Sequence, residues 1–62
     1  MEGQYFYVMQ VIRGSVMIHG PYRSEQARDN RFLKVRGGEV HKFDSYSSDP
    51  NEAIREFKME GV

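Results

Sequence analysis

The side chains with catalytic chemistry gather around His41 in the second half of the chain. An imidazole titrates near neutral pH, so His41 could act as a general base if Asp44 or Asp49 oriented its ring. His41 and Asp44 are three residues apart in a stretch expected to be a strand, so their side chains should point to opposite faces. The serines that follow lack the nucleophile-elbow pattern of hydrolases: Ser45, Ser47 and Ser48. We therefore interpret the protein as a non-enzyme with no catalytic residue.

Bound metals and cofactors are not expected either. The chain has no cysteine, which excludes disulfides and thiolate metal sites. Its two histidines, His19 and His41, lack a second ligand pair at metal spacing. The glycines at Gly14 and at Gly37–Gly38 lack the Lys-Ser/Thr pair of a phosphate-binding loop. The sequence thus predicts no metal and no cofactor.

The length of 62 residues allows one domain, residues 1–62. A domain of this size buries only about 60% of the surface that its unfolded chain exposes. Small proteins usually supply the missing stability with disulfides, a metal or oligomerisation. Because the first two are not expected, the sequence favours a homo-oligomer, and we expect a dimer.

The charges balance over the whole chain but not along it. Nine basic and nine acidic residues give a formal net charge of zero, which argues against a strong non-specific nucleic-acid binder. Residues 13–42 carry seven basic and three acidic side chains, a net charge of +4, whereas residues 43–62 carry two basic and five acidic ones, a net charge of −3. Such a chain can pair with a second copy or present one charged patch to a partner.

No hydrophobic segment points to a membrane. No run approaches the ~18 apolar residues that a bilayer-spanning helix needs. The N-terminus also lacks the basic region and apolar core of a signal peptide. We therefore expect a cytoplasmic protein with no membrane partner.

Residues 5–12 form the clearest element, a strand that is apolar on both faces. Seven of these eight residues are apolar, and several are aromatic or β-branched, which is typical of a strand covered on both sides. Gly14–Ser15 fits a two-residue type II′ turn, after which residues 16–19 complete a hairpin. In this register Gln10 faces His19, either as a hydrogen-bonded pair or as a polar pin that fixes the register within a binding face.

The hairpin divides its side chains between two faces. One face is wholly apolar and is expected to be the core: Tyr5, Tyr7, Met9, Val11, Val16 and Ile18. The other face is mostly apolar but contains the polar pair: Phe6, Val8, Gln10, Ile12, Met17 and His19. We expect this second face to be the interface, because a monomer rarely leaves such an apolar patch exposed.

Two helices and a third strand follow the hairpin. Ser24 is a suitable N-cap for a helix over residues 24–35. Residues 39–47 are expected to form a strand. Asp49 is the expected N-cap of a second helix, with Pro50 at its first position.

The predicted order is β-β-α-β-α, which places the chain in the α+β class. A third strand beside the first would be antiparallel to it, giving a three-stranded antiparallel sheet in the order 2-1-3. The doubly apolar first strand suits the central position. Both helices are expected to pack on one face of the sheet, making a two-layer sandwich.

These features favour a small protein-interaction module that associates with itself through the second face, or binds another protein there. The alternative is a nucleic-acid-binding domain that uses the basic first helix and the adjacent loop. Its candidate contacts are the basic residues of this region: Arg13, Arg28, Arg31, Lys34 and Arg36. Arg28 and Arg31 lie on or beside the apolar side of the helix, where we expect their charged ends to reach water.

Three stretches between residues 20 and 50 resemble a known group of proteins. They are GPYRSEQAR at residues 20–28, GGEV at residues 37–40 and SDP at residues 48–50. Together they resemble short uncharacterised proteins encoded by tailed bacteriophages. The resemblance implies a small accessory protein that binds a host or phage component, and it assigns a role to no individual residue.

Overall fold

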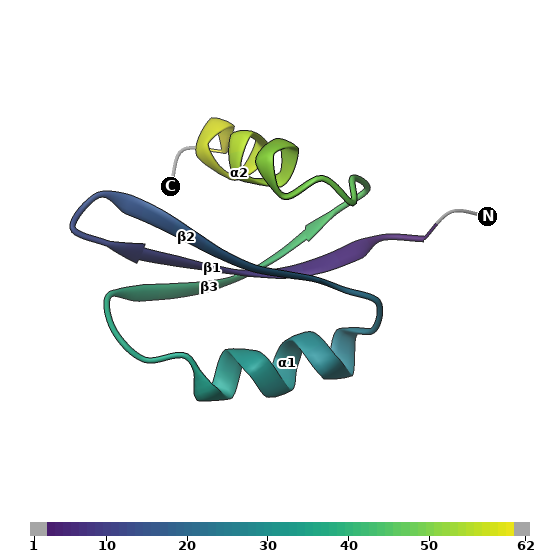
Figure 1. Ribbon diagram of the computed structural model, residues 1–62, viewed down its shortest axis with the longest axis horizontal. Coiled ribbons are helices and arrows are strands. Elements are labelled where there is room, and N and C mark those ends of the chain that lie inside the picture. The colour runs from purple at the N-terminus through teal and green to yellow at the C-terminus, as the bar shows by residue number, and fades with distance from the viewer. Residues whose placement is uncertain (1–2, 61–62) are drawn as a thin grey trace.

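The computed structural model describes residues 3–60 as a three-stranded sheet with two helices (Figure 1). The ends of the expected domain, residues 1–2 and 61–62, lie outside the described residues. The elements follow the expected order: β1 (Tyr5–Ile12), β2 (Ser15–Tyr22), α1 (Glu25–Lys34), β3 (Glu39–Ser45) and α2 (Pro50–Met59). The sheet has the strand order β2-β1-β3, and both strand pairs are antiparallel. The predicted class, element order and sheet topology are thus confirmed.

The two helices lie on opposite faces of the sheet, which corrects the expected two-layer arrangement (Figure 1). On one face Ala53 and Phe57 of α2 pack in a cluster with Tyr7 of β1. On the other face Arg28 of α1 lies over the ring of Phe6, 5.3 Å from its centroid. Because Phe6 and Tyr7 are neighbours in one strand, they point to opposite faces. The molecule therefore has three layers, with the sheet in the middle.

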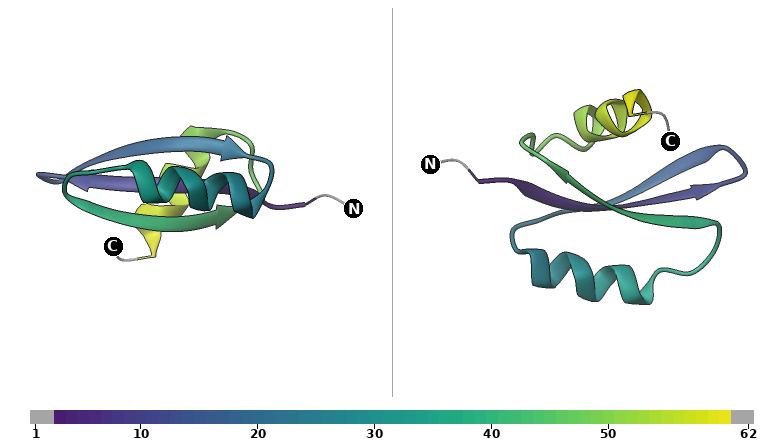
Figure 2. Two further views of the ribbon diagram at one scale, coloured as in Figure 1. Left: turned by 90° about the horizontal axis from the view of Figure 1, so that it is seen from below. Right: turned by 180° about the vertical axis from the view of Figure 1, so that it is seen from behind.

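The central strand explains why both faces are covered. Tyr7, Val8 and Met9 of β1 each have an exposed fraction of 0%. Two helices on one face would leave the apolar side chains of the other face in contact with water. Figure 2 shows that α1 runs along the strands, whereas α2 crosses them.

The hairpin turn is formed by Arg13 and Gly14 rather than by Gly14 and Ser15. Both turn residues have positive φ angles, 53° and 83°, as a type I′ turn requires. The expected type II′ turn is therefore wrong. Ile12 pairs with Ser15 across the turn, and Val11 pairs with Val16.

The shifted register leaves the predicted faces unchanged. Met9 pairs with Ile18, and Gln10 pairs with Met17. From Val8 to Ile12, each residue of β1 pairs with the residue two positions away from its expected partner, and the register shifts between Phe6 and Val8. Because side chains alternate with a period of two, such a shift keeps every residue on its predicted face.

The helix caps are those that the sequence predicts. The backbone N–H of Ala27 donates to Ser24 Oγ over 3.1 Å, at the start of α1. The backbone N–H of Asn51 donates to Asp49 Oδ1 over 3.0 Å, and Pro50 occupies the first turn of α2. These bonds satisfy N–H groups that a helix cannot pair internally.

Candidate interaction site

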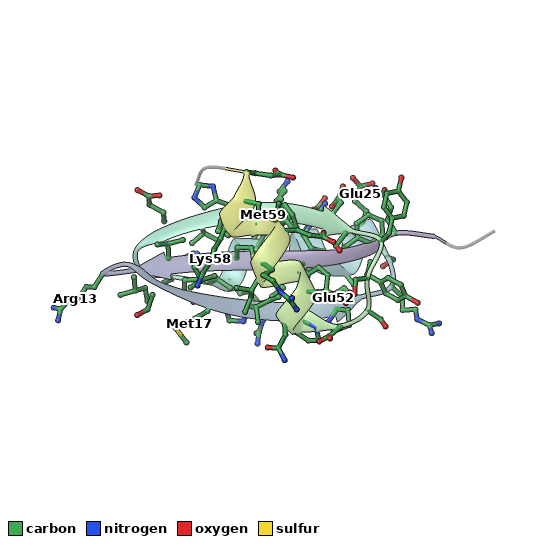
Figure 3. All side chains as sticks on the ribbon, turned by 90° about the horizontal axis from the view of Figure 1, so that it is seen from above. Arg13, Met17, Glu25, Glu52, Lys58 and Met59 are labelled. Atoms are coloured by element: carbon green, nitrogen blue, oxygen red, sulfur yellow. The ribbon has the colours of Figure 1, made fainter. Side chains whose placement is uncertain are left out.

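The face of the sheet that was expected to bind a partner is covered by α1. Val8 and Gln10 are buried, with exposed fractions of 0% and 6%. Phe6, Ile12 and His19 are half-buried. The expectation that this face is open is therefore wrong, because the chain covers it with its own helix. The remaining member of the predicted set, Met17, is half exposed at the β2 edge of the sheet (Figure 3).

Gln10 links the hairpin to the loop after α1. Its side-chain Nε2 donates to the carbonyl oxygens of Arg36 and Gly37, over 2.8 and 3.2 Å. Its Oε1 lies 3.1 Å from His19 Nε2, so the predicted Gln10–His19 pair is present, although the two residues are diagonal neighbours. Burial, with a smaller contribution from the charge of Arg31, lowers the pKa of His19 below its usual value. The side chains of Gln10 and His19 thus use their hydrogen-bonding groups within the protein, which leaves few of these groups for a partner.

Arg28 is buried between α1 and the sheet, with an exposed fraction of 3%. Its Nε donates to Asp29 Oδ1 over 2.9 Å, and its Nη1 lies 3.4 and 3.3 Å from the carbonyl oxygens of Tyr7 and Phe43. The expectation that its charged end reaches water is wrong, because these acceptors and the carboxylate of Asp44 surround the guanidinium. Arg28 therefore cannot serve as a nucleic-acid contact without losing its internal partners.

The other predicted nucleic-acid contacts are exposed but do not all lie together. Arg31 and Lys34 are on the surface of α1. Arg36 follows the helix, where its Nη1 donates to the carbonyl oxygen of Leu33 over 2.6 Å. Arg13 is at the tip of the hairpin and points away from the sandwich (Figure 3). Of the predicted contacts, only Arg31, Lys34 and Arg36 therefore lie near one another, on α1 and just after its C-terminal end.

The two edges of the sheet differ in charge. The whole of β2 has the sequence SVMIHGPY, in which no residue carries a carboxylate, an amine or a guanidinium. The other edge strand, β3, contains Glu39, Lys42 and Asp44. Charged side chains and proline on an edge strand oppose pairing with another chain, so β3 is protected along its length, whereas the half of β2 that precedes Pro21 is not. The sequence offered this signal, because the predicted strand order 2-1-3 already placed both strands at the edges, but the predicted interface was the face of the sheet rather than its edge.

The residues with catalytic chemistry serve structural contacts. The ring of His41 packs against Phe57 with 5.6 Å between centroids, while Asp44 binds Arg28. Ser45 Oγ donates to Glu56 Oε1 over 2.8 Å, which connects β3 with α2. Within residues 3–60, no three histidine, cysteine or carboxylate side chains are grouped in a way that could hold a metal ion.

No similarity to a known protein adds to this description. The chain matches no protein-family model, no curated protein and no solved structure. In the described part of the chain, neither helix is long and apolar enough to cross a membrane. The candidate sites therefore rest on the geometry of the chain itself, and they are the uncharged β2 edge and the basic surface of α1.

Proposed function

We propose that the protein is a small non-enzymatic interaction module that associates with a second copy by pairing their β2 strands. The observation that carries the proposal is the contrast between the uncharged edge strand β2 and the charged edge strand β3. An uncharged edge presents unpaired backbone groups that another strand can bind. A cytoplasmic location and the accessory role that the phage resemblance implies belong to the same proposal.

The turn determines which backbone groups of β2 are available. Ile12 and Ser15 flank a two-residue turn and face each other, so their backbone groups point toward one another. Along an antiparallel pair this orientation alternates, which directs the N–H and C=O groups of Val16 and Ile18 away from β1. Pro21 has no N–H group, so the pairing segment is the half of β2 next to the turn.

A two-fold arrangement satisfies these outward groups in both copies. Pairing Val16 of each copy with Ile18 of the other uses all the outward groups of these two residues. Met17 then lies on the two-fold axis and faces the Met17 side chain of the other copy. Such an interface is self-complementary, and it closes after two copies. It also covers a side chain that is 50% exposed in the single chain.

A single cysteine tests the arrangement, because the chain has none of its own. Residues that face each other in a non-hydrogen-bonded antiparallel pair have Cα atoms about 4.5 Å apart, within the range of a disulfide. We expect Met17→Cys to form a covalent dimer under mild oxidation. The matched control is Met59→Cys on α2, which exposes a more accessible thiol, since Met59 is 82% exposed. Equal cross-linking of both variants would indicate random collision and would contradict the proposal.

Sedimentation equilibrium tests the association of the unmodified chain. We expect a species of twice the 7.3 kDa chain mass at micromolar concentration. Met17→Lys should give a monomer, because two like charges would face each other across the axis. Met59→Lys should leave the dimer intact. A monomeric unmodified chain, or a dimer that survives Met17→Lys, would overturn self-association through β2.

A further inference from the structure

The exposed side of α1 carries basic and amide side chains without a carboxylate. The helix lies in an outer layer of the sandwich, and no other element among residues 3–60 covers its outer side (Figure 1). The exposed residues on this side include two amides, two basic residues and two apolar residues: Gln26, Ala27, Asn30, Arg31, Leu33 and Lys34. The composition of this side differs from that of an ordinary solvated helix, in which acidic and basic residues alternate.

Both carboxylates of α1 lie beside Arg28 on another side of the helix, and both remain accessible to solvent, with exposed fractions of 68% for the Glu25 side chain and 42% for that of Asp29. Asp29 Oδ1 accepts a hydrogen bond from Arg28 Nε, and Glu25 Oε2 lies 3.7 Å from Arg28 Nη2. On a helix, positions 25, 28, 29 and 32 share the side that faces the sheet and its β3 edge. The pKa of Asp29 is lowered, chiefly by the hydrogen bond from Arg28, so this carboxylate stays charged and paired. Both negative charges of α1 thus lie beside the positive charge of Arg28 rather than beside Arg31 and Lys34.

We infer that this exposed side of α1 is a binding surface for double-stranded DNA, with α1 lying in the major groove. The groove of B-form DNA is about 12 Å wide and admits one α-helix. The amides of Gln26 and Asn30 are one helical turn apart, and such side chains pair with the edge of adenine. Arg31, Lys34 and Arg36 would contact phosphates beside the groove. The deep, narrow major groove of double-stranded RNA would not accept the helix.

The zero net charge of the chain does not oppose this inference. The acidic residues of α2 lie in the layer on the far side of the sheet (Figure 1). The exposed charges of residues 49–60 are Asp49, Glu52, Arg55, Glu56, Lys58 and Glu60, two positive and four negative. At physiological ionic strength, charges more than about 8 Å apart through solvent are largely screened. The acidic residues of α2 would therefore contribute little to the interaction with DNA lying on α1. The inference stands on α1 and does not depend on self-association through β2.

Fluorescence anisotropy with a labelled duplex of about 20 base pairs at low salt, where electrostatic binding is strongest, tests the surface with the full chain. We expect binding that weakens as salt rises. The double variant Arg31→Ala/Lys34→Ala should weaken binding at least about tenfold and flatten the salt dependence, since two phosphate contacts are lost. The matched control, Arg55→Ala/Lys58→Ala on α2, removes the same charge. When the variants are compared at about 0.15 M salt, where distant charges are screened, this control should change the affinity less than about twofold.

Replacing the two amides tests the base contacts separately, because a non-specific electrostatic attraction to DNA would not depend on these uncharged side chains. Gln26→Ala/Asn30→Ala should weaken binding to the duplex while leaving the salt dependence unchanged, because base contacts release no counterions. All four positions are exposed, so the variants should keep the circular dichroism of the parent chain. Absence of duplex binding at low salt, equal losses in the α1 and α2 double variants, or equal affinity for double-stranded RNA would each overturn the inference. Sedimentation without DNA reports on self-association separately.

Discussion

Arg28 Nη1 and Asp44 Oδ1 lie 2.7 Å apart, and this ion pair joins α1 to the edge strand β3. The two residues are far apart in the sequence, and the guanidinium is almost fully buried whereas Asp44 is partly exposed. A buried charge without a partner costs free energy of folding. The favoured position of α1 is therefore the one in which the Arg28 guanidinium reaches its acceptors on the sheet. The pair therefore helps to fix the position of the α1 layer on the sheet.

Replacing Arg28 by alanine should lower the free energy of unfolding by about 3 kcal/mol, because the variant loses a buried charge pair and the packing of its side chain. Urea denaturation followed by circular dichroism measures this change. Asp44→Asn should cost less, about 1 kcal/mol, because Asp29 still pairs with the guanidinium. Equal losses in the two variants would show that the Asp44 contact, rather than burial of the arginine, carries the stability.

The sequence could predict the topology because local signals agree with the fold. The doubly apolar β1 indicated a central strand, and Ser24 and Asp49 marked the helix starts. The turn was harder to predict, because a single glycine fits the first position of a type II′ turn as well as the second position of a type I′ turn. The type I′ turn places Arg13 at a φ of 53°, and residues other than glycine rarely adopt a positive φ.

The side of the sheet on which each helix packs could not be predicted from local patterns. The charged end of Arg28 was expected to reach water, but Arg28 is buried, whereas the neighbouring Ala27 is exposed. Burial of an arginine depends on acceptors supplied by other elements, here Asp44 of β3 and the carbonyl oxygen of Tyr7 in β1. Such acceptors come together only in the folded chain, so neither the buried side of α1 nor the sheet face that it covers could be assigned in advance.

The pH dependence of stability should have a component from His19. Burial and the nearby Arg31 lower its pKa, so the folded protein favours the neutral imidazole. As pH falls, the unfolded chain takes up this proton first, near pH ~6.5. The contribution of His19 is therefore complete above that pH and is lost as pH falls toward the lower pKa of the folded state. An NMR titration should give a His19 midpoint below that of an unfolded peptide, and a midpoint at or above it would contradict the environment described.

Two glycines with positive φ should respond differently to substitution by alanine. A Cβ atom on Gly38, at φ +63°, would lie against the carbonyl oxygen of Val11, whereas one on Gly14, at φ +83°, would meet no atom within 4 Å. Gly14→Ala should therefore cost only the conformational penalty of about 1–2 kcal/mol. Gly38→Ala must also move the loop away from β1 and should cost clearly more in urea denaturation. Equal costs would mean that the loop shifts freely.

Val8→Asp and Met17→Asp separate the buried face of the sheet from its free edge. Both residues point toward the α1 side, but Val8 has an exposed fraction of 0% and Met17 one of 50%. A carboxylate at position 8 would be buried without a partner. This burial should lower the free energy of unfolding by several kcal/mol, which is comparable to the whole stability of a small domain. Val8→Asp should therefore lose its helical circular dichroism, whereas Met17→Asp should keep it and sediment as a monomer. If Val8→Asp instead stays folded and only loses association, α1 does not cover this face permanently, and the interface is the sheet face rather than the β2 edge.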